Sequence, residues 1–154
     1  MLENVPKCID HAAIFRALDI KEKNRHNNTM NKIRLINGPN LNMLGTREPA
    51  LYGKQTLGQI HENMIKKATE LHLDLETFQS NAEHELIDTL QAAPADGVNF
   101  IIINPAALTH TSIALRDALL AINLPFIEIH LSNPQAREPF RKASLIADIA
   151  IGTI

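Results

Sequence analysis

An apolar run from Val98 to Ile103, interrupted only by Asn99, constrains the fold more than any other feature of this sequence. Apolar and polar residues do not alternate in it, so a strand built from the run has to be covered on both faces. Such strands are typical of the centre of a parallel sheet, because crossover helices pack on both of its faces. The run therefore predicts an α/β fold.

Further strand-like and helix-like segments alternate along the sequence. The predicted strands are Ile33–Ile36, Leu73–Phe78, Val98–Ile103, Pro125–Ile129 and Ile146–Ile154. The predicted helices are Thr56–Leu71, Glu83–Ala93, Thr111–Ala121 and a short one over Pro139–Ser144. Because right-handed crossovers must cover both faces, we predict a flavodoxin-like, doubly wound sheet of five parallel strands in the order 2-1-3-4-5. Ligands then bind beyond the carboxyl ends of the first and third strands.

The first part of the chain, residues 1–31, does not fit this alternating pattern. Ile9–Ile20 has the spacing of a short amphipathic helix, and the polar run Lys21–Asn28 after it is typical of a linker. Met30 stands immediately before the first predicted strand. We expect Met30 to be the functional start, residues 1–31 to be a flexible or partly helical extension, and residues 32–154 to be the folded domain. The alternative is that Ile9–Ile20 is a genuine docking helix.

Composition argues against several classes of protein. The formal net charge of the 154 residues is −2, and no basic stripe with interleaved aromatic residues is present, so nucleic acid is not an expected partner. No apolar run approaches the roughly 20 residues of a membrane span, and the amino terminus lacks the pattern of a secretory signal. The single Cys8 fits a reducing compartment. We expect a cytoplasmic protein.

The loop Asn37–Gly53 follows the first predicted strand, where a doubly wound sheet places its ligands. Glycine and proline residues shape the loop, and among them stand three polar residues, Asn40, Arg47 and Tyr52. A nearby guanidinium favours the anionic form of a tyrosine, and a phenolate can act as a base at neutral pH. We therefore expect this loop to contribute to a catalytic site.

Two further predicted strands also end in polar residues. These residues are Asn104, His110, Glu128, His130, Ser132, Asn133, Arg137 and Arg141. The carboxyl ends of parallel strands lie at one edge of the sheet, so a single cleft can hold all of them. Some of these residues and their neighbours also have a purely structural interpretation. Asn104 can belong to a turn, His110 can be a surface histidine, and the adjacent Thr111 and Ser112 can be helix caps.

Glu128 and His130 are two residues apart on a predicted strand, so their side chains share one face. A carboxylate beside an imidazole fixes its orientation and favours its protonated form, which suits a general acid. The alternative is a partly exposed ion pair. Arg137 and Arg141 follow the same strand and suit an anionic substrate, unless both are simply solvated.

Other kinds of catalytic site fit the sequence less well. His110, His130 and Glu128 could form a metal-ligand set, but the neighbouring arginines would oppose a bound cation. No serine stands in a nucleophile-elbow context, and no glycine-rich phosphate loop is present. A bound metal is therefore not our main expectation, and a metal-dependent hydrolase remains an alternative hypothesis.

Three long motifs in the same order resemble type II 3-dehydroquinate dehydratase, and the resemblance covers Lys32 to Ile154. The motifs are Asn37–Gly53, Asn104–Ser112 with Ala114–Asp117, and Ile127–Asn133 with Ala136–Arg141. The resemblance implies a flavodoxin-like enzyme of the shikimate pathway that removes water from 3-dehydroquinate to give 3-dehydroshikimate. It also implies a reaction without a metal, a cofactor or a covalent intermediate.

The resemblance assigns a role to each polar residue. Tyr52, as a phenolate, would take the proton next to the ketone, Arg47 would support that anion, and Arg137 would add positive charge near it. Asn40 would hold a water that stabilises the enolate. His130, oriented by Glu128, would protonate the departing hydroxyl. The residues that would bind the substrate are Asn104, Ser132 and the backbone at Leu131 for its carboxylate, and His110 and Arg141 for its ring hydroxyls.

The resemblance also implies an oligomer. Asp117 matches a residue that the family offers across a trimer contact, and the family commonly forms a dodecamer of four trimers. Family members continue into a carboxyl-terminal helix, whereas this chain stops at Ile154, so we expect a domain that lacks that helix. A flavodoxin-like binding protein that keeps the pocket without turnover is therefore our second hypothesis.

Overall fold

Five parallel strands form one sheet in the order β2-β1-β3-β4-β5 in the computed structural model, which describes residues 31–46 and 54–154. The strands are β1 (Asn31–Asn37), β2 (Leu73–Gln79), β3 (Phe100–Asn104), β4 (Phe126–Glu128) and β5 (Gly152–Thr153). This order confirms the prediction of a doubly wound, flavodoxin-like sheet. The strand order reverses between β1 and β3, and their carboxyl ends therefore mark the expected ligand site.

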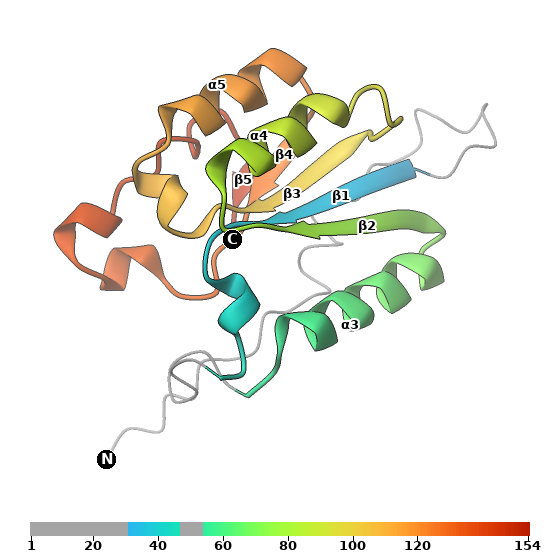
Figure 1. Cartoon of the computed structure of the whole chain (residues 1–154), viewed down its shortest axis with the longest axis horizontal. Helices are drawn as coiled ribbons and strands as arrows, with labels where there is room; N and C mark the ends of the chain where they lie inside the picture. Colours follow the sequence, from blue (N-terminus) through green and yellow to red (C-terminus); the bar gives the residue numbers. More distant parts are fainter. Residues whose placement is uncertain (1–30, 47–53) are drawn as a thin grey trace.

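Helices cover both faces of this sheet (Figure 1). Helix α3 (Leu57–Glu70) lies on one face, and α4 (Glu83–Ala92) and α5 (Ile113–Ile122) lie on the other. Four short 3-10 turns follow strands: η1 (Leu41–Met43), η2 (Ala106–His110), η3 (Pro134–Ala136) and η4 (Pro139–Arg141). No helix in the described part of the chain is long and apolar enough to cross a membrane.

Polar caps set where two of the helices begin. The Thr56 hydroxyl accepts a hydrogen bond from the Gln59 backbone N–H at 3.3 Å, and the Gln59 side chain accepts one from the Thr56 N–H at 3.0 Å. This capping box satisfies two backbone donors that a helix start leaves unpaired. The Ser112 hydroxyl likewise accepts from the Leu115 N–H at 2.8 Å and begins α5.

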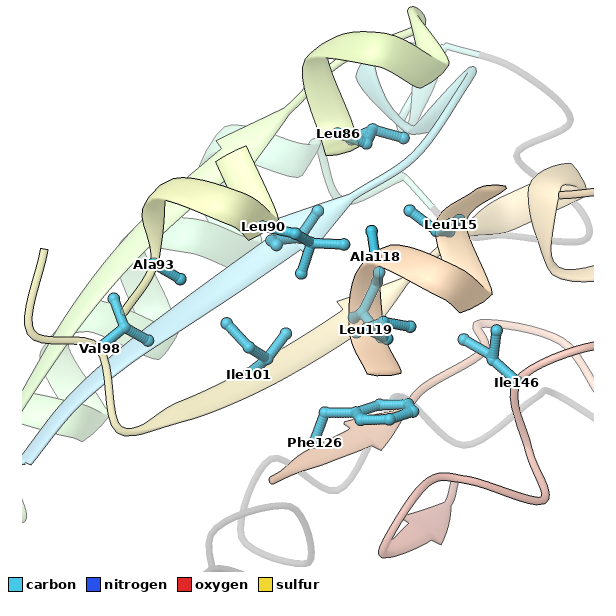
Figure 2. Packing of buried hydrophobic residues seen from close by; sticks show 12 residues of the cluster. Leu86, Leu90, Ala93, Val98, Ile101, Leu115, Ala118, Leu119, Phe126 and Ile146 are labelled. Carbon is cyan, nitrogen blue, oxygen red and sulfur yellow. The ribbon is translucent and has the colours of Figure 1, made fainter. Parts of the chain in front are cut away.

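Strand β3 lies at the centre of the core, as its apolar run predicts, and all five of its residues are buried. Phe100 and Ile102 belong to the cluster under α3, whereas Ile101 and Ile103 belong to the cluster under α4 and α5. Figure 2 shows the second cluster, in which side chains of α4 and α5 pack toward β3 and β4. One strand therefore contributes to both hydrophobic layers, as expected for a sheet covered on both faces.

The carboxyl-terminal strand is much shorter than predicted. We expected a strand over Ile146–Ile154, but only Gly152 and Thr153 form β5 beside β4. Ile146 instead packs into the core under α4 and α5, while Ile151 is 67% exposed. The apolar residues of this segment therefore belong to turns as well as to a strand.

Ion pairing explains why this segment turns rather than extends. Arg116 of α5 donates to the Leu145 carbonyl oxygen at 2.6 Å and to an Asp148 carboxylate oxygen at 2.9 Å. Both contacts hold the chain against α5 before it reaches the edge of the sheet. The predicted helix over Pro139–Ser144 is also shorter than expected, because only the single turn η4 forms there.

Two sets of predictions lie outside the described residues. Residues 1–30 of the proposed extension, with its helix over Ile9–Ile20, are one of them, and the loop residues Arg47 and Tyr52 are the other, whereas Asn31 begins β1. These remain predictions from the sequence.

Candidate active site

A cavity of about 170 Å³ opens at the carboxyl ends of β1, β3 and β4. Its walls come from the loop after β1, from η2 and from the segment that follows β4. The lining residues are Pro39, Asn40, Leu41, Met43, Leu44, Asn104, Ala106, Ala107, His110, His130, Leu131, Ser132, Pro134, Arg137 and Arg141. The cavity therefore lies where the strand order reverses, and segments far apart in the sequence meet there.

Most of the candidate residues within the described part of the chain line this cavity. Those that line it are Asn40, Asn104, His110, His130, Leu131, Ser132, Arg137 and Arg141. Glu128 is fully buried and hydrogen-bonded to His130. Asp117 is exposed on α5 and does not line the cavity. One chain thus brings eight of the candidates together and leaves Asp117 apart.

Gly38 brings the loops after β1 and β3 into contact. Its backbone N–H donates to the Asn104 carbonyl oxygen at 2.8 Å. A Cβ atom at position 38 would lie 2.4 Å from the Pro105 carbonyl oxygen, which is closer than any real contact. Only glycine fits this approach, because it has no Cβ.

Asn40 reaches the cavity from a left-handed backbone conformation, with φ of 68°. Asparagine tolerates this conformation better than most residues do. The Asn40 backbone N–H donates to the side-chain oxygen of Asn81 at 2.8 Å, and Gln79 donates to the same oxygen at 3.2 Å. The loop after β2 therefore holds Asn40 in place.

Asn104 is the last residue of β3 and is buried, with 3% of its surface exposed. Its side-chain oxygen accepts a hydrogen bond from the Ala106 backbone N–H at 3.2 Å. This bond closes the turn that carries Ala106 at a φ of 53°. The side-chain NH₂ group of Asn104 is then its remaining donor for a ligand in the cavity.

His110 has one ring nitrogen committed to the protein. Its Nδ1 lies 2.7 Å from the Ala143 carbonyl oxygen. A carbonyl oxygen can only accept, so Nδ1 carries the hydrogen and donates it. Nε2 is therefore the nitrogen that His110 can present to the cavity.

Buried Glu128 and partly buried His130 form a pair at the end of β4. Glu128 is 0% exposed, and its Oε1 lies 2.8 Å from His130 Nε2. The same carboxylate accepts from the Thr109 hydroxyl at 3.2 Å and from the Ser144 hydroxyl at 2.9 Å. With two hydroxyl donors beside it, the carboxylate is placed to accept the Nε2 hydrogen, which leaves His130 Nδ1 for the cavity.

Positive charge gathers on one wall of the cavity. Arg137 donates to the Ser132 hydroxyl at 3.3 Å, and its Nε lies 3.5 Å from a Glu138 carboxylate oxygen. Arg141 Nε lies 3.1 Å from the same oxygen. A backbone hydrogen bond at Glu138 and the two guanidiniums lower the pKa of Glu138, so it is ionised at neutral pH. Two cations and one anion leave a net positive charge, which suits an anionic ligand.

The sequence did not single out three residues that support the site. Asn81 holds Asn40, while Thr109 and Ser144 donate to Glu128. Thr109 lies within one of the three motifs, so its position carried a signal. Asn81 stands in an ordinary polar segment and Ser144 in a mostly apolar one, and their supporting roles become visible only through their contacts. Within residues 31–46 and 54–154, no group of three His, Cys, Asp or Glu side chains has the arrangement of a metal site.

Comparison with known proteins gives consistent results. The family model of class II dehydroquinase matches residues 31–154. Over 123 residues the chain is 64% identical to the 3-dehydroquinate dehydratase of Nitrosomonas eutropha, covering 80% of this chain and 85% of that protein. Over 120 residues it is 60% identical to 3-dehydroquinate dehydratase 1 of Pseudomonas aeruginosa, covering 78% and 82%.

Solved structures agree with the sequence matches. The type II dehydroquinase of Butyrivibrio crossotus superposes with a TM-score of 0.79 at 40% identity, covering 81% of this chain and 87% of that one. The type II dehydroquinase of Propionibacterium acnes gives a TM-score of 0.76 at 39% identity, covering 82% and 88%. Sequence and fold therefore point to the same group of proteins.

Proposed function

Because this chain belongs to the class II dehydroquinase family, we propose that the cavity at the strand ends is where it acts on its substrate. The activity is 3-dehydroquinate dehydratase activity, a lyase step of the shikimate pathway. The observation that supports the location is the buried Glu128–His130 pair, which adjoins a cavity with a positively charged wall. An acid and fixed positive charge are what dehydration of an anionic hydroxyketone requires.

The first step that we propose is removal of the proton next to the ketone. Tyr52, as a phenolate, takes this proton, and the electrons of the C–H bond form an enolate. Arg47 and Arg137 favour the phenolate because a cation stabilises a nearby anion. Asn40 holds the water that hydrogen-bonds the enolate oxygen. The support for Asn40 is its fixed position at the cavity wall.

The second step is loss of the hydroxyl group. The enolate electrons return to form the conjugated double bond as the carbon–oxygen bond breaks, and His130 gives a proton to the departing oxygen, which leaves as water. Glu128 holds the Nε2 hydrogen of His130, so Nδ1 is the nitrogen that we assign to this transfer. Solvent then restores the protonation of both side chains, and no metal or cofactor takes part in the mechanism that we propose.

Binding of the substrate uses the remaining groups of the cavity. We assign its carboxylate to Asn104, Ser132 and the backbone at Leu131. His110 and Arg141 then bind the ring hydroxyls, for which Nε2 of His110 is available. This division matches a ligand that carries one negative charge and several hydroxyl groups.

Oligomerisation would complete the site. Asp117 lies on the exposed face of α5 together with Ile113, which is 65% exposed, and Leu120, which is 52% exposed. Asp117 and Leu120 follow Ile113 by four and seven positions, so the three side chains share one face of the helix. An exposed face with apolar residues is typical of an interface. We propose that this face brings Asp117 to a neighbouring site in a trimer, and that four trimers form a dodecamer. Light scattering coupled to gel filtration measures this assembly.

The unit that carries the activity is, in our proposal, residues 32–154, close to the segment that the family model matches. Residues 1–31 are then an extension outside the catalytic unit. We also place the enzyme in the cytoplasm.

A direct assay tests the activity. The purified chain is mixed with 3-dehydroquinate, and the ultraviolet absorbance of the conjugated enone product is followed with and without a chelator. Growth of the signal that resists the chelator supports the proposal, whereas loss of activity on chelation supports a metal-dependent enzyme. A flat trace, with substrate binding detected by calorimetry, supports a binding protein without turnover.

Replacing the proposed base gives the sharpest test of the mechanism. Tyr52→Phe removes the phenol hydroxyl, and we expect kcat to fall by at least ~100-fold, since a general base contributes that much or more. Calorimetry on the variant should still detect the substrate. Near wild-type turnover by Tyr52→Phe would remove this residue from the role of base.

A further inference from the structure

Ser144 contacts the carboxylate of Glu128 more completely than any other hydroxyl in the described residues. Its Oγ lies 2.9 Å from Oε1 and 2.9 Å from Oε2. The same Oγ accepts hydrogen bonds from the backbone N–H groups of Ile146 at 3.1 Å and Ala147 at 3.0 Å. A hydroxyl has one hydrogen and two lone pairs, so its hydrogen has to point at Glu128.

The segment that carries Ser144 is fixed by contacts on both sides. The Leu145 backbone N–H donates to the Thr109 carbonyl oxygen at 2.8 Å. The Leu145 carbonyl oxygen accepts from Arg116 at 2.6 Å, and Arg116 also binds Asp148 at 2.9 Å. Ser144 therefore donates from a rigid position, which a side chain needs if it is to fix another.

The two oxygens of Glu128 differ in their partners. His130 and Thr109 both donate to Oε1, at 2.8 and 3.2 Å. Ser144 is the hydroxyl that reaches Oε2. Without Ser144, the buried Oε2 loses the hydrogen bond from this hydroxyl, and the carboxylate can rotate to find another donor. Such a rotation moves Oε1, the acceptor that holds His130 Nε2.

We propose that Ser144 is a positioning residue for the general acid. It holds the Glu128 carboxylate so that Oε1 faces His130 Nε2, and it thereby keeps His130 Nδ1 turned to the substrate. Ser144 touches neither substrate nor transferred proton; it acts through Glu128. This inference rests on the proposed function, because it assumes that His130 protonates the departing hydroxyl.

The test compares two steps of the reaction in the full chain. In D₂O, the exchange of the acidic substrate proton for deuterium reports proton removal, and formation of the enone reports loss of water. Ser144→Ala should lower kcat about 10- to 100-fold, since a misplaced acid loses part of the usual contribution of acid catalysis. KM should change little, and exchange should rise relative to loss of water. Ser144→Thr, which keeps the hydroxyl, should recover most of the activity.

Ser112→Ala is the matched control, because it removes a buried hydroxyl that caps α5 without touching Glu128. If both alanine variants lower exchange and loss of water in equal proportion, Ser144 is merely structural and the proposal is wrong. If Ser144→Ala does not fold, Ser144→Cys carries the test, because a thiol fills the same position but donates only weakly to Glu128. An unchanged ratio of exchange to loss of water in that variant again contradicts the proposal. A wild-type chain that forms no enone contradicts the proposed function instead.

Discussion

Two buried charges lie on the same face of the sheet and are held in opposite ways. Arg34 of β1 and Glu128 of β4 both point to the face that α4 and α5 cover, and their exposed fractions are 7% and 0%. The Arg34 guanidinium donates to the Thr89 carbonyl oxygen at 2.6 Å and to Asp96 at 2.7 Å, and it also binds the Glu76 carboxylate. Its partners are two carboxylates and one backbone carbonyl, and none of them lines the cavity.

Glu128 has a different set of partners. Two neutral hydroxyls, from Thr109 and Ser144, and one imidazole, from His130, surround it. The imidazole also lines the cavity, so this cluster is open on the side where a ligand binds. A buried charge whose partners are fixed acceptors stabilises the fold, whereas one that holds a titratable group beside a cavity can take part in chemistry.

The largest effect should come from removing the charge of Glu128. Glu128→Gln keeps the size of the side chain but places an NH₂ group among the donors of Thr109, Ser144 and His130. We expect kcat to fall about 100-fold, because the acid loses its orientation and the partner of its positive charge. The loss of unfolding free energy should be smaller, about 1 kcal/mol. Steady-state kinetics and urea unfolding measure the two quantities. A variant that loses stability but keeps kcat would place Glu128 with Arg34 as a structural charge.

The next effect should appear in stability alone. Arg34→Met keeps the apolar stem and removes three interactions, and we expect the free energy of unfolding to fall by about 2 kcal/mol. This loss is moderate because Glu76 and Asp96 have side chains 32% and 46% exposed and can be hydrated. Urea unfolding measures the loss, and kcat should not change. A large fall in kcat without a fall in stability would contradict the purely structural role that we assign to Arg34.

The smallest effect concerns acid. The hydrogen bond from Arg34, helped by the charges of Arg34 and Lys32, lowers the pKa of Asp96 below its ordinary value of 3.8. A lowered folded-state pKa stabilises the protein above the ordinary value, and the stabilisation is lost as the pH falls through the lower one. Asp96→Asn should therefore unfold at lower urea than wild type at neutral pH, with the difference shrinking as the pH falls below the ordinary value of 3.8. An equal difference at both pH values would contradict this linkage.

Much of this architecture was predictable because it depends on patterns with a fixed period. The apolar run at Val98–Ile103 placed β3 at the centre of the sheet, and the strand order followed from the handedness of crossovers. The same reasoning failed over Ile146–Ile154, where Ile146 enters the core from a turn. An apolar run does not reveal that Arg116 will hold the chain back through Asp148.

The site was predictable where strand ends carried its residues. Asn104 ends β3 and His130 follows β4, and the topology alone brings them to one cavity. Ser144 was not predictable, because it reaches Glu128 across 16 positions of irregular chain. Asp117 belongs to a third case, since its side chain is exposed on α5 and any partner for it lies beyond one chain.

In any redesign of this pocket for another substrate, Gly38 is a position that cannot be changed. Every other amino acid would drive a carbon atom against the Pro105 carbonyl group, and the loops after β1 and β3 would have to separate. The walls of the pocket stand on those loops, so one added methyl group would widen the pocket and disorder it at the same time. A mutant library should therefore leave position 38 as it is.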